Sequence, residues 1–114
     1  MKVKGFYTKL VGVSFLNNDG SSRQGLLTQF SDVSEENPLR LYLERDTENL
    51  YDAKAVAVFT EEGKQLGYLS RKINEIVAPW LDRGENVFVE GVSITGGFPG
   101  HLGLNIWIEK RAAA

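Results

Sequence analysis

The stretch ERDTENLYDAKAVAVFTEEGKQLGYL (residues 44–69) decides how this chain folds. It ends one strand, passes through a polar turn and a Leu-Tyr-Asp step, and enters a strand predicted over residues 53–60. A Glu-Glu-Gly turn then reverses the chain into a second strand over residues 64–69, with Gly63 at the left-handed position that such a turn needs. The stretch therefore predicts a β-hairpin, and the polar and aromatic side chains that could touch a ligand gather at its ends.

Two segments on either side of the hairpin have clear periodicity. Residues 39–44 (LRLYLE) alternate apolar and polar side chains, as a half-buried strand does. Residues 70–83 instead carry apolar side chains at the spacing of an amphipathic helix. Ser70 is the expected N-cap of this helix. Pro79 is expected to kink it or to begin a new turn, and Gly84 to end it.

The remaining elements follow from shorter signals. A long first strand is expected over residues 4–16, bent at Gly12, and a short helix over residues 21–30. Ser21 and Gln24 have the spacing of a capping box at the start of that helix. Two further strands are predicted at 86–95, with a bulge at Gly91, and at 102–109. Helices inserted between strands, without regular alternation, favour a small antiparallel barrel or curled sheet with a helix across one open end.

Length and composition limit the possible classes of protein. A chain of 114 residues forms one domain, expected over residues 4–110, with flexible termini at 1–3 and 111–114. It has no cysteine and one histidine, His101, so we expect no disulfide, no metal site and no cofactor. No apolar run has the length of a bilayer span and no secretory h-region follows the first lysines, so we expect a cytoplasmic protein, associated with the nucleoid if it binds DNA.

Signs of catalysis are weak throughout the sequence. It contains no P-loop, HExxH or GxSxG motif, and the glycine-rich segment 96–100 leads into a strand rather than a helix. Asp46, Glu48 and Asp52 could form a carboxylate site, but acidic residues around Asn49 are foremost turn formers. An enzyme is the least favoured hypothesis.

Recognition of a single-stranded nucleic acid is a better candidate function. It needs aromatic faces for bases to stack on and a few cations for the phosphates. The net charge of −2 argues against a protein that coats nucleic acid by bulk positive charge, so any phosphate contact must be local. Each aromatic could instead fill the core. The candidates at strand ends and loops are Phe15, Tyr51, Tyr68 and Phe98, with Arg71 and Lys72 at the start of the second helix.

The same stretch of sequence resembles a known family. The segment LERDTENLYDAKAVAVFTEEGKQLGYLSRKINEIVAPWLDRGENV is similar to the core of a HIRAN domain, with its Asn-x-Tyr-Asp step, alternating Ala-Val strand and Gly-Tyr-Leu strand. The match extends upstream through residues 11–13 and 18–24, and downstream to residues 105–107. This family occurs at the N-terminus of fork-remodelling SWI2/SNF2-type DNA translocases and as short stand-alone bacterial proteins. The resemblance implies a mainly β fold, an OB-like six-stranded antiparallel β-barrel with two inserted short helices.

The resemblance also implies a function, the binding of a free 3′ end of single-stranded DNA in repair or replication-fork processing. Tyr51 matches the stacking ring and Asp52 the acceptor of the terminal 3′-hydroxyl. Phe15 and Phe98 match further aromatics, and Arg71 matches a basic residue that holds phosphate. A helicase or nuclease supplied in trans is the expected partner, and no membrane is involved.

Two departures from the family pattern leave an alternative open. Ser14 stands where the fork-remodelling members have an arginine, and Tyr68 stands where they have a histidine. The loss of one phosphate-binding charge predicts weaker DNA binding. The alternative is a protein-interaction or regulatory module with a degenerate DNA pocket, using a surface at residues 26–30. In that case Asp52 would only cap the turn before the third strand, and Tyr51 would only cover the barrel end.

Overall fold

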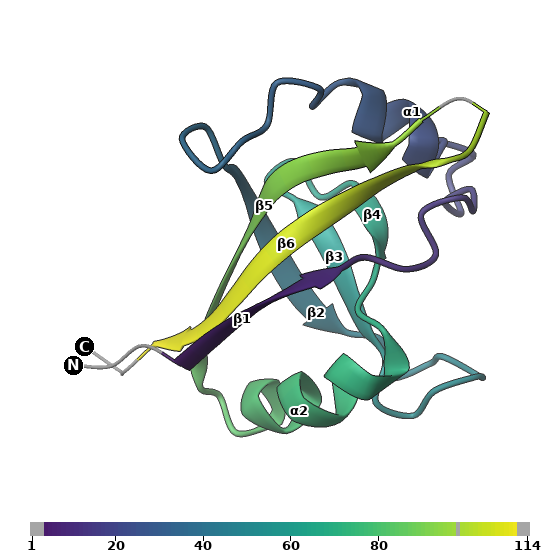
Figure 1. Cartoon of the computed structure of the whole chain (residues 1–114). Coiled ribbons are helices and arrows are strands. Elements are labelled where there is room, and N and C mark those ends of the chain that lie inside the picture. Colours follow the sequence, from purple (N-terminus) through teal and green to yellow (C-terminus); the bar gives the residue numbers. More distant parts are fainter. Residues whose placement is uncertain (1–3, 98, 112–114) are drawn as a thin grey trace.

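The computed structural model describes residues 4–97 and 99–111, which form a curled sheet with a helix at each end (Figure 1). Phe98 therefore lies outside the described residues, as do the terminal segments 1–3 and 112–114. No helix in the described residues is long and apolar enough to cross a membrane. The elements in chain order are β1 (Lys4–Lys9), α1 (Arg23–Thr28), β2 (Leu39–Arg45), β3 (Val56–Thr60), β4 (Gln65–Tyr68), α2 (Arg71–Asp82), β5 (Asn86–Gly96) and β6 (Leu102–Arg111).

The six strands form one antiparallel sheet in the order β1-β6-β5-β2-β3-β4. The sheet curls until its two edges meet beyond the end of β1. There Val11 and Tyr68 exchange two backbone hydrogen bonds, each with an N···O distance of 2.9 Å. The expectation of a mainly β, OB-like antiparallel barrel with two inserted helices is confirmed.

The core fills the inside of the curled sheet. Val56 and Val58 of β3 are completely buried, as are Leu41 of β2 and Ile106 of β6. Burial of each such side chain stabilises the fold by roughly 1.5–3 kcal/mol. Figure 1 shows α1 and α2 at opposite ends of the sheet, where Leu27 of α1 closes the core at one end. At the other end α2 packs its buried face, which includes Val77, Ala78 and Trp80, against the core.

The prediction of one long first strand over residues 4–16 is wrong. The strand ends at Lys9, and Leu10 makes the last backbone bond to β6, from its N–H to Leu104 O at 3.1 Å. Val11 then pairs with the opposite edge of the sheet, and Gly12 has a φ of 70°. This left-handed conformation suits glycine and turns the chain away from the strand direction.

The hairpin and the last two strands agree with the sequence apart from their ends. Gly63 has the predicted left-handed conformation, with a φ of 82°. The pairing of β5 with β6 shifts register between Gly91 and Ser93, which confirms the predicted bulge. Arg111, expected in a flexible tail, instead pairs with Asn86 as the last residue of β6.

The second helix is also confirmed, with Ser70 as its N-cap and Gly84 beyond its end. Pro79 begins no new turn, because α2 runs through it to Asp82. Proline removes only one donor from the helix, whose would-be acceptor belongs to the exposed residue Glu75.

The predicted capping box of the first helix is wrong. The N-cap is Ser22, whose hydroxyl accepts a bond from Gly25 N at 3.0 Å. The amide of Gln24 turns instead toward the barrel. Its Nε2 donates to Val13 O at 3.0 Å and to Leu102 O at 2.9 Å, and its Oε1 accepts from Leu102 N at 2.8 Å. Gln24 therefore ties α1 to the start of β6 and to the segment after β1.

The barrel closure predicts a strong effect of a methyl group at Gly67. A Cβ there would lie 2.5 Å from Val11 O, a backbone atom that cannot move without breaking the bond between the two edges. We expect Gly67→Ala to lower the free energy of unfolding in urea by about 1–3 kcal/mol, as overpacked sites do. The matched control is Gly25→Ala in α1, whose Cβ would meet no atom nearer than 3.4 Å. Equal stability of the two variants would contradict this account of the closure.

The side-chain clamp of Gln24 gives a second prediction. Gln24→Leu removes three hydrogen bonds and leaves their backbone partners unpaired, so we expect a loss of about 2–4 kcal/mol in the free energy of unfolding. Gln29→Leu serves as the control because Gln29 is exposed at the end of the same helix. If both variants unfold at the same urea concentration, the clamp does not stabilise the fold.

Candidate nucleic-acid interface

A groove of about 320 Å³ lies beside the barrel closure. Three segments line it, namely the chain after β1, the loop between β2 and β3, and the junction of β4 with α2. The structure thus brings together five of the six predicted site residues, which are Phe15, Tyr51, Asp52, Tyr68 and Arg71. The sixth, Phe98, falls outside the described residues.

Two of the predicted aromatics do not fill the core. Tyr51 is 84% exposed and Phe15 is 66% exposed, although both line the groove. Tyr68 is half-buried, and its hydroxyl donates to Asp46 Oδ2 at 2.8 Å. The guanidinium of Arg23 lies over this ring in a cation–π contact, with its Cζ 5.6 Å from the ring centroid. The rings of Tyr51 and Phe15 are therefore free to contact a ligand, whereas Tyr68 is held in place by its contacts with Asp46 and Arg23.

Asn49 sets the conformation of the loop that carries Tyr51 and Asp52. Its Oδ1 accepts from the backbone N–H of Tyr51 at 2.8 Å and from that of Asp52 at 2.9 Å. Its Nδ2 donates to Asp46 Oδ2 at 3.4 Å. An asparagine that bonds the amides two and three residues ahead stabilises a tight turn. Asn49 was predicted only as part of a polar turn, although the Asn-x-Tyr-Asp spacing is the sequence signal for this positioning role.

Asp52 both caps its turn and faces the groove. Its Oδ1 accepts from Lys54 N at 2.9 Å, and its Oδ2 accepts from Asn74 Nδ2 at 2.8 Å. The amide of Asn74, the N–H of Lys54 and the charge of Arg71 all hold the pKa of this carboxyl below its usual range. The group is therefore an ionised, acceptor-only carboxylate at neutral pH. Because a carboxylate has about four lone-pair sites, the two bonds it accepts here leave capacity for further donors.

Asn74 is a polar residue of the groove that was not predicted from the sequence. It projects from α2 and is only 3% exposed, and its Oδ1 is the one buried side-chain acceptor in the described residues without a partner. Turning the amide over would place Oδ1 against the carboxylate of Asp52, so the observed orientation is the favourable one. Its spacing in the sequence indicates this position, because Asn74 lies one helical turn before Val77 and Ala78, which are buried on the inward face of α2.

Arg71 lies at the rim of the groove and supplies an exposed positive charge. Its Nη2 donates to the backbone carbonyl of Tyr51, which joins the start of α2 to the loop. The neighbouring Lys72 is exposed as well, but it does not line the groove. The positive charge therefore lies on the same side of the groove as Asp52.

A larger hollow, of about 560 Å³, lies elsewhere on the barrel, beside β1, β5 and β6. None of the five predicted site residues within the described part of the chain lines it. Tyr7 is an aromatic residue that lines this hollow. Its hydroxyl donates to Glu35 at 2.8 Å, and its ring packs on Trp107 with centroids 4.8 Å apart. Size alone does not identify a site, and the free aromatic faces and perturbed carboxylate are at the smaller groove. Within residues 4–97 and 99–111, no three acidic, histidine or cysteine side chains converge as metal ligands would.

Comparison with known proteins identifies relatives of this fold. The model of the HIRAN domain family matches residues 4–109. The crystal structure of the HIRAN domain of human HLTF superposes with a TM-score of 0.65 at 17% identity, covering 94% of this chain and 74% of that one. The crystal structure of a Lactobacillus plantarum protein superposes with a TM-score of 0.63 at 24% identity, covering 96% and 98% of the two chains. No curated protein sequence matches.

The carboxylate of Asp52 gives a prediction about pH. Its pKa is lower in the folded protein than its ordinary value of 3.8, so the unfolded chain takes up the proton first as the pH falls. The stability that Asp52 contributes is therefore complete above about pH 4 and is lost as the pH falls through the folded pKa. We expect Asp52→Asn to lose less stability than wild type between pH 6 and pH 3 in urea unfolding.

The control for this measurement is Asp32→Asn, since Asp32 is exposed and its carboxylate has no hydrogen-bond partner among the described residues. We also expect Asn74→Ala to raise the pKa of Asp52, because it removes the largest cause of the shift. A carboxyl carbon NMR titration measures this directly. An unchanged pKa in Asn74→Ala would contradict the assigned cause.

Proposed function

Because the chain belongs to the HIRAN domain family, we propose that it is a nucleic-acid-binding module that holds the 3′ end of single-stranded DNA in the groove at the barrel closure. The observation that carries this proposal is the pair of Tyr51 and Asp52. An 84% exposed ring stands next to an ionised carboxylate, and one loop holds both. A base can stack on the ring while the carboxylate accepts a hydrogen bond from the sugar.

The chemistry of the carboxylate supports a terminal nucleotide over an internal one. Within a DNA strand every 3′-oxygen is esterified, so only the last nucleotide offers a 3′-hydroxyl that can donate. A 3′-phosphate would instead bring negative charge against the negative charge of Asp52. In this proposal Asp52 distinguishes a free end from a blocked one. Phe15, on the segment after β1, is exposed and free to stack on a second base, and Tyr68 also lines the groove.

The positive charge available for phosphate contact is small. Arg71 is the single cationic side chain lining the groove within the described residues, and the protein as a whole has a net charge of −2. Ser14 is exposed beside Phe15 and adds no charge there. A small number of phosphate contacts predicts a shallow salt dependence, with a slope of log K against log salt of about −0.7 per contact.

The composition of the groove supports binding rather than catalysis. Among the described residues its lining contains no serine, threonine, histidine or cysteine, and the charged groups are Asp52 and Arg71. Nucleophilic catalysis requires a nucleophile with a base to activate it. We therefore propose a role in DNA repair or replication-fork processing in which a helicase or nuclease supplied in trans performs the chemistry.

The alternative function is a protein-interaction module on the same fold. The apolar residues of the surface proposed for it, at residues 26–30, are largely packed against the core, and the exposed residues Thr28 and Gln29 are polar. Leu27 is completely buried, and Leu26 and Phe30 are half-buried against the core. A surface of this kind offers little apolar area to a partner, which favours the groove as the working site.

Fluorescence anisotropy with a 5′-labelled single strand tests the proposed function. We expect the strand with a 3′-hydroxyl to bind more tightly than the same strand with a 3′-phosphate, and Asp52→Asn to reduce this preference. Tyr51→Ala should weaken binding by about 5- to 150-fold, the range for loss of one stacked base. The matched control is Tyr42→Ala, because Tyr42 is 42% exposed on β2 outside the groove. Equal affinity for both strands would exclude 3′-end recognition, and no binding to either would favour the protein-interaction module.

A further inference from the structure

Arg23 is a buried charged residue next to the groove. Only 7% of it is exposed. Its Nε donates to Asn17 Oδ1 at 2.8 Å and its Nη1 donates to Gly12 O at 2.8 Å. The third contact is the cation–π interaction with Tyr68. All three partners are neutral, whereas a buried cation normally has a negative partner.

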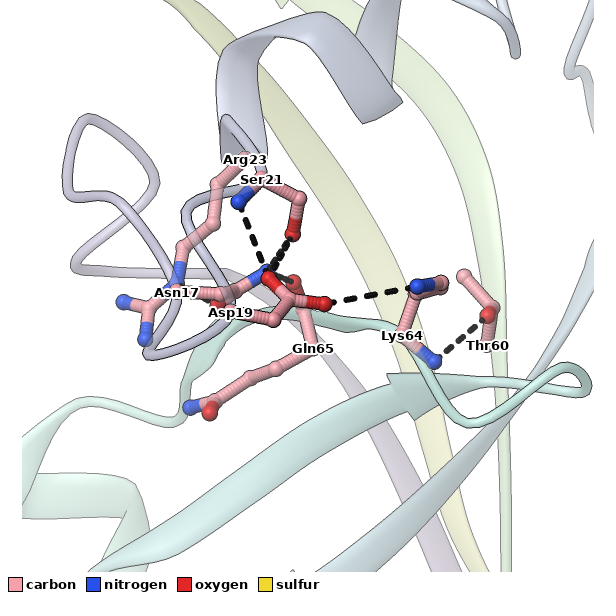
Figure 2. Close-up of polar contacts among 7 residues, drawn as sticks. All are labelled: Asn17, Asp19, Ser21, Arg23, Thr60, Lys64 and Gln65. Carbon is pink, nitrogen blue, oxygen red and sulfur yellow. Dashed lines mark hydrogen bonds and ion pairs between the residues drawn. The ribbon is translucent and has the colours of Figure 1, made fainter.

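The nearby carboxylates do not neutralise this charge. Figure 2 shows the guanidinium directed away from Asp19, whose carboxylate accepts from Ser21 N at 2.9 Å and from Lys64 Nζ at 3.4 Å. The ion pairs found within residues 4–97 and 99–111 join other residues, and none includes Arg23. Asp46 bonds the hydroxyl at the far end of the Tyr68 ring.

The guanidinium also has unused donors. Its Nη2 has no acceptor among the described residues. This nitrogen is therefore available to an acceptor that the described residues do not supply. An arginine presents its terminal N–H groups as a planar fork that matches the oxygens of a phosphate.

The atoms around Gly12 show where Arg23 lies relative to the groove. A Cβ at Gly12 would lie 3.4 Å from Arg23 Nη1, 3.6 Å from Tyr68 Cδ2 and 3.7 Å from Phe15 Cδ2. The guanidinium and the two rings therefore converge on one glycine in the wall of the groove. Arg71 is instead bonded to the loop of Tyr51.

We propose that Arg23 is the cation of an anion subsite at the wall formed by Gly12, Phe15 and Tyr68, and that this subsite takes a phosphate group of the bound strand. The identity of this ligand, a phosphate of a bound strand, rests on the proposed function of the groove. The subsite supplies from within the barrel wall a charge that Ser14, exposed on the surface nearby, does not provide. Burial makes this charge more effective, because a cation shielded from water attracts a phosphate more strongly than an exposed one does.

A purely structural role is the competing explanation for the burial of Arg23. Its bond to Gly12 O also holds the segment that carries Phe15. A purely structural arginine would affect affinity by displacing this segment, but it would not change the number of phosphates neutralised. The salt dependence of binding distinguishes a phosphate-binding Arg23 from a structural one, because its slope reports the number of phosphates that the protein neutralises.

The first experiment measures binding of the 3′-hydroxyl strand over a series of salt concentrations. We expect Arg23→Met to weaken binding about tenfold at low salt and to make the slope shallower by about 0.7, the value for one phosphate contact on a single strand. Arg23→Lys, which keeps the charge, should retain the wild-type slope. Asn17→Ala removes the acceptor of Nε and keeps the charge, so its slope should also match wild type. Arg83→Met is the control for loss of an exposed cation outside the groove and should change neither quantity.

The second experiment uses wild-type protein and inorganic phosphate, so it needs no DNA binding and no variant. We expect the backbone amide NMR signals of Gly12 and Phe15 to shift in a saturable manner as phosphate replaces chloride at constant ionic strength. The absence of localised shifts, or an unchanged slope in a folded Arg23→Met variant, would overturn the anion subsite. Wild-type protein that binds no strand but shows the phosphate shifts would overturn the proposed function and leave the subsite supported.

Discussion

The backbone bridge between Val11 and Tyr68 is the interaction on which the rest of the structure depends. It is a single antiparallel pair with two hydrogen bonds of 2.9 Å, and it joins the two edges of a six-stranded sheet. The approach is so close that only a residue without a Cβ fits at Gly67. Because the bridge holds the chain after β1 against the start of α2, it also creates the groove. The closure of the barrel and the candidate site are therefore one structural feature.

A network of polar side chains keeps this groove in shape without a ligand. Asp46 accepts from both Tyr68 and Asn49, Asn49 holds the amides of the Tyr51–Asp52 turn, and Asn74 holds the carboxylate of Asp52. The network leaves one buried acceptor without a partner, which costs about 1–3 kcal/mol. A cost of this kind is typical of functional sites, where side chains are oriented for a ligand rather than for stability. Preorganisation of the carboxylate also lowers the entropic cost of binding.

Sequence reasoning succeeded where local pattern and tertiary structure agree. The alternation in β2, the helical spacing in α2 with its Ser70 cap, and the left-handed Gly63 all follow from short-range chemistry, and the structure confirms them. It failed where a long-range contact overrode a local signal. Gln24 has capping-box spacing but bonds β6 instead, 78 residues away, and the first strand ends early because Val11 pairs with Tyr68. Asn74 and Arg23 escaped notice because single polar residues in a sequence do not show which of them will be buried.

The sequence by itself determined the type and order of the elements, the mainly β class, and the five groove residues Phe15, Tyr51, Asp52, Tyr68 and Arg71. These depend on periodicity, turn chemistry and a family resemblance, all of which can be read along the chain. Only the tertiary structure decided that these residues share one groove, that Tyr51 and Phe15 are exposed, and that Arg23 lies buried beside them without a negative partner among the described residues. The reason is physical. Burial and electrostatic pairing arise from contacts between segments that are far apart in sequence, and the closure of the barrel sets those contacts.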